Sequence, residues 1–250
     1  MIEVTIDGQK IEVPERTTIL HAAKELGIWI PTLCYHEALS PWGACRICIV
    51  EIKSGKRTKM VTACNFPIEG PIEVFTDSER VQMNRRMSME LLLARCPNVP
   101  AIKELGEKLG ITETRFPKED KYCILCGQCI SVCEEVIGRS AIQFVDRGIE
   151  TKPETPFLVV SDECIGCGAC AYVCPTGVIY MSDEGGVRKI KRWHAEFELV
   201  RCKECGKPIT TKQHIDYLKE KISLPDYIFE LCGDCKKQFY LEKTFSLGHM

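Results

Sequence analysis

The sequence predicts an α+β protein built from four successive parts, and three observations support this prediction. Short alternating strand patterns with tight-turn residues occupy residues 1–76. A helical pattern fills residues 77–122. Beyond it, closely spaced cysteines recur at a constant interval in residues 123–184 and return in residues 195–250. Strands and helices segregated in this way along a chain are typical of the α+β class.

The composition is that of a globular protein, apart from an excess of cysteine. The chain has 250 residues and a formal net charge of −2, so no basic excess points to nucleic acid or to an anionic membrane. Its start lacks the features of a secretory signal, and no apolar run is long enough to span a bilayer, so we expect a cytoplasmic protein. In a reducing compartment, 17 cysteines favour metal ligation over disulfides.

Residues 1–76 predict a small β-rich domain. Two alternating strands in MIEVTIDGQKIEV are joined by the tight-turn pair Asp7-Gly8. Thr17 and Thr18 open a short helix, ILHAAKELG, which Gly27 closes. Three further strand segments, CIVEI, TKMVTA and PIEVFT, complete the domain. This order of elements is similar to that of a β-grasp ferredoxin.

Residues 77–122 predict a helical linker. Asp77 or Ser78 can cap a helix that runs through ERVQMNRRMSMELLLAR. The apolar residues at roughly helical spacing in this helix are Val81, Met87, Leu91 and Leu92. A second short helix, AIKELGEKLG, is expected to stop at Gly110. We interpret this pair as packing helices that space two cysteine-rich domains.

Four cysteines of the first domain have the spacing C-x10-C-x2-C-x15-C. They are Cys34, Cys45, Cys48 and Cys64. Thiolates from one loop and one later strand end suit a [2Fe–2S] cluster, in which each iron takes two of them. Gly43 would let the backbone approach such a cluster closely. A structural zinc ion is the alternative, but zinc sites usually present two short CxxC pairs and this set has one.

Residues 123–184 contain an internal repeat of C-x2-C-x2-C-x3-C with an offset of 41 residues. This is the bacterial ferredoxin spacing, in which three cysteines bind one [4Fe–4S] cluster and the fourth reaches the other cluster. Cluster A is therefore expected to use Cys123, Cys126, Cys129 and Cys174. Cluster B is expected to use Cys164, Cys167, Cys170 and Cys133. Pro175 follows the last cysteine of the second run as the pattern expects, whereas Glu134 takes that place in the first run.

Residues 195–250 predict a zinc-ribbon-like module with two more CxxC pairs, separated by 26 residues. Its candidate ligands are Cys202, Cys205, Cys232 and Cys235. This pattern is typical of a structural zinc ion that closes a small domain. A further iron–sulfur cluster is the alternative. Residues 185–194 are expected to be a solvated linker, and Cys96 is expected to be a buried, inert thiol.

Three segments together resemble a known family: LCYHEALSPWGACRICIVEI, CILCGQCISVCEEVIG and CIGCGACAYVCPTGVI. They are similar to the N-terminal portion of the large iron–sulfur subunit of respiratory complex I. They are also similar to the diaphorase small subunit of NAD-linked [NiFe]-hydrogenases and to the N-terminal part of [FeFe]-hydrogenase catalytic subunits. The resemblance covers roughly residues 1–182. Family members usually carry a further His-x3-Cys-x2-Cys…Cys site, and because Cys96 stands alone here, that cluster is expected to be missing.

The function expected from this resemblance is electron transfer within a larger oxidoreductase. The sequence contains no G-x-G-x-x-G fingerprint and no catalytic triad. We therefore expect no catalytic residues on this chain. The resemblance implies two partners, a flavin/NAD(H)-binding subunit and hydrogenase subunits, in a soluble NAD-linked complex with or without electron bifurcation. The alternatives are the same role in a formate dehydrogenase or other dehydrogenase complex, and a free-standing polyferredoxin.

Overall fold

The computed structural model describes residues 1–247, with side chains described as far as residue 241. The chain forms two compact units. Unit 1 comprises residues 1–136 and 173–178, and unit 2 comprises residues 137–172 and the chain from residue 179 onward. The last three residues of the predicted C-terminal module, 248–250, lie outside the described part.

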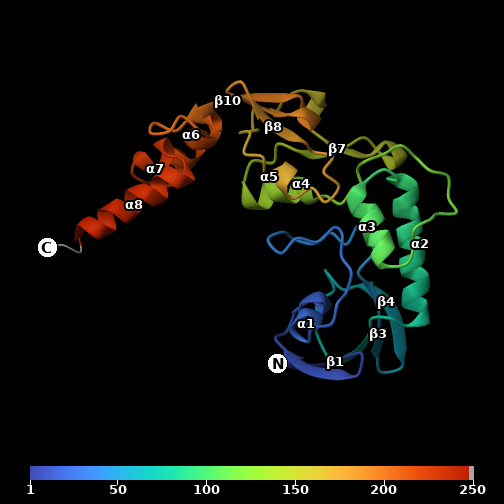
Figure 1. The fold of residues 1–250 in the computed structure, drawn as a ribbon. Helices are drawn as coiled ribbons and strands as arrows, with labels where there is room; N and C mark the ends of the chain where they lie inside the picture. The colour runs from blue at the N-terminus through green and yellow to red at the C-terminus, as the bar shows by residue number, and fades with distance from the viewer. Residues whose placement is uncertain (248–250) are drawn as a thin grey trace. The chain divides into compact units, whose positions relative to one another are not determined.

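Unit 1 begins with a five-stranded mixed sheet in the order β2-β1-β5-β3-β4 (Figure 1). Its strands are β1 (Ile2–Ile6), β2 (Gln9–Val13), β3 (Ile49–Ser54), β4 (Arg57–Thr62) and β5 (Ile72–Phe75). β1 pairs with β5 in parallel, and the other neighbours pair antiparallel. Asp7 and Gly8 form the first hairpin turn with φ of 47° and 83°. The strands predicted for residues 1–76 are confirmed.

Helix α1 (Ile19–Glu25) closes the core of this sheet. The Thr18 side chain caps it by accepting a hydrogen bond from the backbone N–H of His21 at 3.3 Å. Its inner face buries Ile19 and Leu20 in one hydrophobic cluster with strand residues such as Ile6. Full burial of each such side chain is worth about 1.5–3 kcal/mol, so this small domain has a hydrophobic core of its own.

Two helices follow in unit 1, α2 (Glu79–Arg95) and α3 (Pro100–Lys108), and they lie side by side (Figure 1). Ser78 is the N-cap of α2, and its side chain accepts a hydrogen bond from the backbone N–H of Val81 at 3.3 Å. Pro100 occupies the first turn of α3, where its missing N–H has no intrahelical partner to lose. The predicted helix pair is confirmed.

The buried face of α2 differs from the predicted one. Val81 and Leu92 are buried as expected, but Met87 and Leu91 are 40% and 50% exposed. The buried positions instead step by four residues from Val81 to Arg85 and Met89. Because Arg85 is charged, it does not count as a member of an apolar pattern even though it lies on the inner face. The spacing of hydrophobic residues alone therefore predicted a different buried face.

Short elements carry the cysteine repeat. In unit 1 they are α4 (Gln128–Ser131) and the π-helical turn Val132–Val136. In unit 2 they are the strand pair β6 (Gln143–Val145) and β7 (Lys152–Glu154), two 3₁₀ turns at Gly148–Glu150 and Pro156–Leu158, and α5 (Ala169–Tyr172).

Unit 2 also contains a four-stranded antiparallel sheet in the order β11-β10-β9-β8. Its strands are β8 (Met181–Glu184), β9 (Val187–Ile190), β10 (Ala195–Arg201) and β11 (Pro208–Thr211). The linker predicted for residues 185–194 is therefore wrong, since these residues supply β9 and the 3₁₀ turn Lys191–Trp193. Gly185 and Gly186 both adopt positive φ and close the β8–β9 hairpin.

Three helices end the described chain: α6 (Lys212–Lys221), α7 (Tyr227–Glu230) and α8 (Gly233–Leu247). Thr211 caps α6 by accepting a hydrogen bond from the backbone N–H of His214 at 3.2 Å. None of the helices in the described residues combines the length and the apolar character needed to cross a bilayer.

Candidate metal centres

The four cysteines of the first domain lie together in the interior of unit 1. Their exposed fractions are 3% for Cys34, 6% for Cys45, and 1% for both Cys48 and Cys64. The thiols pair by hydrogen bonding, Cys34 with Cys45 and Cys48 with Cys64. Two pairs of sulfur ligands match the two irons of a [2Fe–2S] rhomb, each of which binds two thiolates. The donor set therefore fits that cluster.

Backbone N–H groups in the loop that carries these cysteines donate hydrogen bonds to sulfur. The Cys45 backbone N–H donates to Cys34 Sγ at 3.4 Å. The pKa of Cys34 is lowered to about 6, first by its hydrogen bond with the Cys45 thiol and then by backbone N–H groups of Cys45 and Ala44. Gly43 adopts a φ of +65°, and a Cβ there would lie 2.7 Å from the Asn65 side-chain nitrogen. The positive φ and this close contact therefore favour glycine at this position.

Arg85 braces the same loop from helix α2. Its guanidinium donates to the carbonyl oxygens of Ile47 at 3.2 Å, Ile49 at 3.1 Å and Thr76 at 2.9 Å. Burial lowers the pKa of Arg85, and the neighbouring Asp77 carboxylate and Cys48 thiolate oppose that shift. The guanidinium therefore places a positive charge close to the predicted [2Fe–2S] ligands.

The four predicted ligands of cluster A all belong to unit 1, although Cys174 is distant in sequence from the others. Burial raises the pKa of Cys126 to about 12, and the thiolates of Cys123, Cys174 and Cys34 add to that rise. Cys174 thus lies within electrostatic reach of the first run, as the crossover pattern expects. The set comprises three thiols from one run and one from the other, which fits a [4Fe–4S] cubane.

Trp42 supports the loop of cluster A. Gly127 adopts a φ of +77°, and a Cβ there would lie 2.8 Å from the Trp42 ring. The Trp42 indole N–H donates to the Ser131 hydroxyl at 2.7 Å. The Ser40 backbone N–H donates to the Glu135 carboxylate at 2.9 Å. The segment before Cys45 therefore packs directly on the first cysteine run.

Three of the predicted ligands of cluster B, namely Cys164, Cys167 and Cys170, lie in unit 2. Cys133 lies in the π-helical turn of unit 1, so its place in cluster B stays a prediction. Gly166 and Gly168 adopt positive φ within the run. Added Cβ atoms would meet the Phe197 ring at 2.6 Å and the Met181 sulfur at 2.5 Å, respectively.

The β8–β11 sheet holds this second run through three polar contacts. Arg188 donates to the carbonyl oxygen of Gly166 at 3.2 Å, and the Thr211 hydroxyl donates to that of Ile165. The Trp193 indole N–H donates to Cys170 Sγ at 3.4 Å. Sequence patterns alone did not identify these residues. The one available signal was Trp193, a large aromatic side chain in the mostly small and basic run of residues 185–194.

The four C-terminal cysteines form one compact group. The ligand atoms of Cys202, Cys205, Cys232 and Cys235 all lie within 4.8 Å of one another. Cys205 and Cys232 place their sulfurs 3.6 Å apart. Tetrahedral zinc with bonds of about 2.3 Å separates its sulfur ligands by roughly 3.8 Å. This geometry fits a single tetrahedral ion, because a cubane would hold the thiolates farther apart.

Backbone amides favour the thiolate form at this group. The Cys232 N–H donates to Cys202 Sγ at 3.2 Å. The pKa of Cys202 is lowered to about 6, with the backbone N–H groups of Cys205 and Cys232 as the two largest causes. A deprotonated thiol is the form that binds a metal ion.

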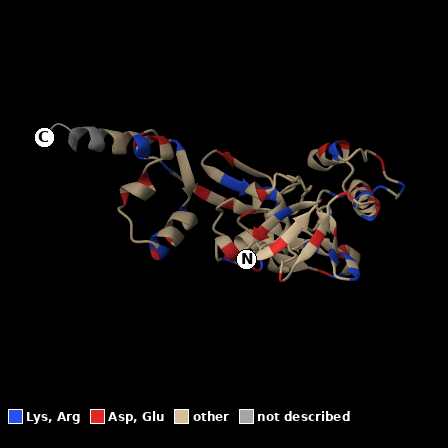
Figure 2. Ribbon diagram, turned by 90° about the horizontal axis from the view of Figure 1, so that it is seen from below, with Lys and Arg blue, Asp and Glu red and all other residues tan. Residues whose placement is uncertain are grey.

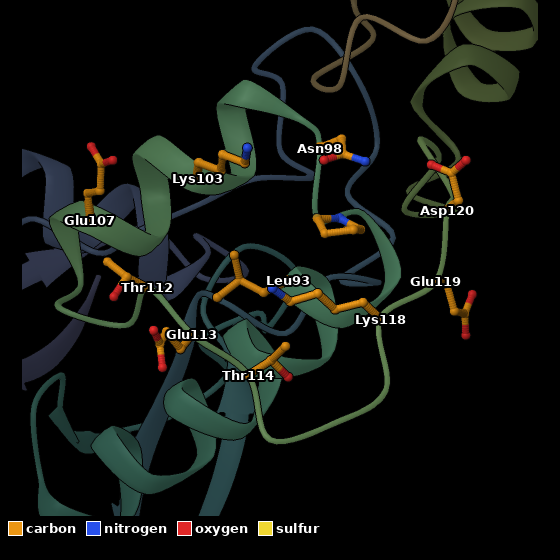
Figure 3. A pocket seen from close by; sticks show the side chains of 11 residues that line it. Leu93, Asn98, Lys103, Glu107, Thr112, Glu113, Thr114, Lys118, Glu119 and Asp120 are labelled. Carbon is orange, nitrogen blue, oxygen red and sulfur yellow. The ribbon is translucent and has the colours of Figure 1, made fainter.

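Cys96 belongs to none of the four predicted ligand sets, although it shares a hydrophobic cluster with Cys34, Cys45 and Cys126. It is fully buried in a hydrophobic cluster of unit 1, and burial raises its pKa to about 11. Near it, a pocket of 620 Å³ opens between α2, α3 and the segment that follows them (Figure 3). Its lining residues offer amines, carboxylates, hydroxyls and an amide, such as Lys103, Glu107 and Thr114, with no thiol or imidazole.

Charged side chains of both signs are distributed along the described ribbon (Figure 2). The basic run within residues 188–192 is partly neutralised by acidic neighbours in the sheet. Arg188 pairs with Asp183 at 2.8 Å, and Lys189 pairs with Glu196 at 3.2 Å.

Family comparisons match the segments of the chain that contain these cysteines. Residues 1–79 match the family described as a 2Fe-2S iron-sulfur cluster binding domain. Residues 118–181 and 163–211 each match a family described as a 4Fe-4S dicluster domain.

Curated relatives are subunits of oxidoreductases. The chain is 38% identical over 208 residues to NADPH-Fe(3+) oxidoreductase subunit alpha of Geobacter sulfurreducens. It is 34% identical to a subunit of the NADH-quinone oxidoreductase of Rhizobium meliloti and 33% identical to NADP-reducing hydrogenase subunit HndD of Solidesulfovibrio fructosivorans. Each match covers 72% of this chain but only 24%, 24% and 36% of the respective relative. The chain therefore spans about a quarter to a third of the length of these proteins.

A solved structure extends the likeness to three dimensions. A chain in the crystal structure of an NAD⁺-reducing [NiFe]-hydrogenase in the H₂-reduced state superposes with a TM-score of 0.55 at 26% identity. The match covers 62% of this chain and 75% of that one. The chain thus carries one [2Fe–2S] domain and a [4Fe–4S] dicluster domain, and it is similar to parts of NAD(P)-linked oxidoreductase and hydrogenase subunits.

Proposed function

We propose that this protein is the electron-transfer subunit of a multisubunit NAD-linked hydrogenase, with one [2Fe–2S] and two [4Fe–4S] clusters. The twelve proposed ligands are those assigned above to the first domain and to clusters A and B. When bound, such clusters accept and release single electrons. The observation that carries the proposal is the shared hydrophobic cluster of unit 1, which contains thiols of two of the three cysteine sets.

That hydrophobic cluster contains thiols from two of the proposed sites. Cys34 and Cys45 of the [2Fe–2S] set belong to it together with Cys126 of cluster A. Fully buried apolar side chains such as Ile47 and Met89 fill the space around them. Because interactions between charges are screened weakly in a low-dielectric interior, the Cys34 thiolate affects the pKa of Cys126. Two redox sites placed this way suit stepwise transfer of electrons through the chain.

The proposed partners are a flavin/NAD(H)-binding subunit and hydrogenase subunits. The names of the relatives support NAD(P)-linked redox chemistry, and two comparisons concern hydrogenases. The same set of iron–sulfur clusters could transfer electrons in a formate dehydrogenase or another dehydrogenase complex, because the substrate site would lie on a different chain. Electron bifurcation and a cytoplasmic location stay predictions.

We propose further that the C-terminal cysteine group holds one structural Zn²⁺. Its four sulfurs are close enough for one tetrahedral ion, and Cys202 and Cys232 are buried, with the Cys232 backbone N–H donating to Cys202 Sγ. A metal at this position would tie the loop after β10 to the start of α8. That role is structural, since Zn²⁺ has no redox chemistry.

Anaerobic purification of the chain with its native partners tests the main proposal. The preparation should contain about ten irons per chain, from two, four and four, and one zinc. Low-temperature spin resonance of the reduced protein should show one [2Fe–2S] and two [4Fe–4S] signals. A folded preparation with only two or six irons would contradict the cluster assignment.

Co-purifying subunits decide between the partner alternatives. A nickel-containing or iron-containing hydrogenase subunit supports the hydrogenase assignment, whereas a molybdenum or tungsten subunit supports formate dehydrogenase. A lone species of 28.3 kDa in native extract would contradict both and would favour a free-standing polyferredoxin.

A further inference from the structure

Trp193 is the largest side chain in the described residues that is fully buried, at 1% exposed. It ends the 3₁₀ turn that joins β9 to β10, and His194 follows it in the left-handed conformation with a φ of 51°. The strands on either side are paired at Ile190 and Ala195, both of which are 1% exposed. The indole is thus held in one orientation by a rigid hairpin rather than by a mobile loop.

The indole nitrogen of Trp193 forms a hydrogen bond with a predicted cluster ligand. Trp193 Nε1 donates to Cys170 Sγ at 3.4 Å, and both side chains are buried. An indole nitrogen can only donate, so this group interacts more strongly with a thiolate as negative charge on the sulfur increases. A [4Fe–4S] cluster gains one negative charge when it is reduced, and hydrogen bonds to its sulfurs are among the factors that set its potential.

We propose that Trp193 raises the reduction potential of cluster B by donating its indole N–H to Cys170 Sγ. The inference rests on the proposed function, because it assumes that Cys170 is an iron ligand. Trp193 acts through Cys170 and is a positioning residue with an electrostatic effect. The surrounding contacts fit this role, since Arg188 donates to the carbonyl oxygen of Gly166 in the same cysteine run.

Replacement of the donor is the direct test. Trp193→Phe keeps an aromatic ring and removes the N–H, and Trp29→Phe is the matched control, because Trp29 is 63% exposed. Both variants are compared with the unaltered full chain by redox titration under spin resonance. Since charge-assisted hydrogen bonds are about twice as strong as neutral ones, Trp193→Phe should lower the reduction equilibrium constant of one cubane by roughly three- to tenfold. Tenfold corresponds to 59 mV for a one-electron couple.

The expected pattern is selective. Only one of the two cubane potentials should fall in Trp193→Phe, the [2Fe–2S] potential should stay unchanged, and Trp29→Phe should match the unaltered chain. A purely structural effect of the substitution would instead reduce the iron content without moving the potential of the remaining clusters. Unchanged potentials in an iron-replete Trp193→Phe protein would overturn the proposal.

A second measurement does not depend on whether that variant folds. The chain has three tryptophans, so it can be grown with ¹⁵N-indole tryptophan and examined for ¹⁵N hyperfine coupling to a reduced cubane. Trp42→Phe removes the tryptophan that packs on the first cysteine run, and the coupling to the other cubane should persist in it. If both cubanes are present but no coupling is seen, the role proposed for Trp193 is refuted and the proposed function still stands. If no cubane signal is seen, the proposed function itself is refuted.

Discussion

Replacement of Arg85 by methionine should destabilise unit 1 and the [2Fe–2S] site with it. The guanidinium makes three hydrogen bonds to backbone carbonyl oxygens, and two of these, on Ile47 and Ile49, flank Cys48. The side chain of Arg85 is only 10% exposed, so water cannot replace the lost donors without opening the helix–sheet interface. Methionine has a similar length and no donor, so the variant isolates the polar contribution.

The magnitude follows from the hydrogen bonds. A hydrogen bond to a charged group is worth about 1.5–3 kcal/mol, and three that share one side chain are not additive. We therefore expect the free energy of unfolding to fall by about 3–5 kcal/mol, because each buried carbonyl oxygen left without a donor costs about 1–3 kcal/mol. With a urea dependence of about 1–3 kcal/mol per molar, the unfolding midpoint should fall by roughly 1 M or more.

The assay is anaerobic urea unfolding followed by the visible circular dichroism of the [2Fe–2S] site. Arg86→Met is the matched control, because it makes the same change one residue later on the exposed face of α2. Surface substitutions usually stay within about 0.5 kcal/mol. If Arg85→Met and Arg86→Met unfold at the same urea concentration, the bracing role assigned to Arg85 is wrong.

Three further substitutions and one control variant test the metal sites. Gly127→Ala should lose the iron of cluster A, because the added Cβ would lie 2.8 Å from the Trp42 ring. Gly110→Ala is the control, since Gly110 also has a positive φ but has open space around it. This control should keep the iron and lower the free energy of unfolding by only about 1–2 kcal/mol. Equal iron in the two variants would count against the steric argument. Cys202→Ser should release one zinc, as measured by metal analysis, and should leave the iron–sulfur spectra unchanged. Loss of iron instead of zinc would show that the site holds a cluster. Cys96→Ala should retain all iron in the same analysis, since any loss would make Cys96 a ligand.

Local patterns were sufficient to predict most elements of unit 1. The Asp7-Gly8 turn, the Thr18 cap and the Ser78 cap each depend on interactions within a few residues, so the sequence shows them directly. The buried face of α2 could not be predicted in the same way. Arg85 is buried because carbonyl oxygens of β3, its preceding loop and the end of β5 satisfy it, and those groups are distant in sequence.

The β8–β11 sheet shows the same limit. Residues 185–194 have a basic, glycine-rich composition that is typical of a solvated linker. In the structure, Asp183 and Glu196 pair with two of the basic side chains, while Trp193 is buried against Cys170. Strand pairing and burial depend on partners that composition does not reveal.

By itself, the sequence determined which side chains can bind metal, because thiolate chemistry and the short spacing between cysteines are local properties. Tertiary structure decided which thiols come near one another: Cys34 pairs with Cys45, and Cys174 lies close enough to Cys126 to raise its pKa. It also decided which donors reach the sulfur atoms, as Trp193 does at Cys170. The physical reason is that a hydrogen bond requires two groups at about 3 Å, and only the folded chain brings groups so distant in sequence to that separation.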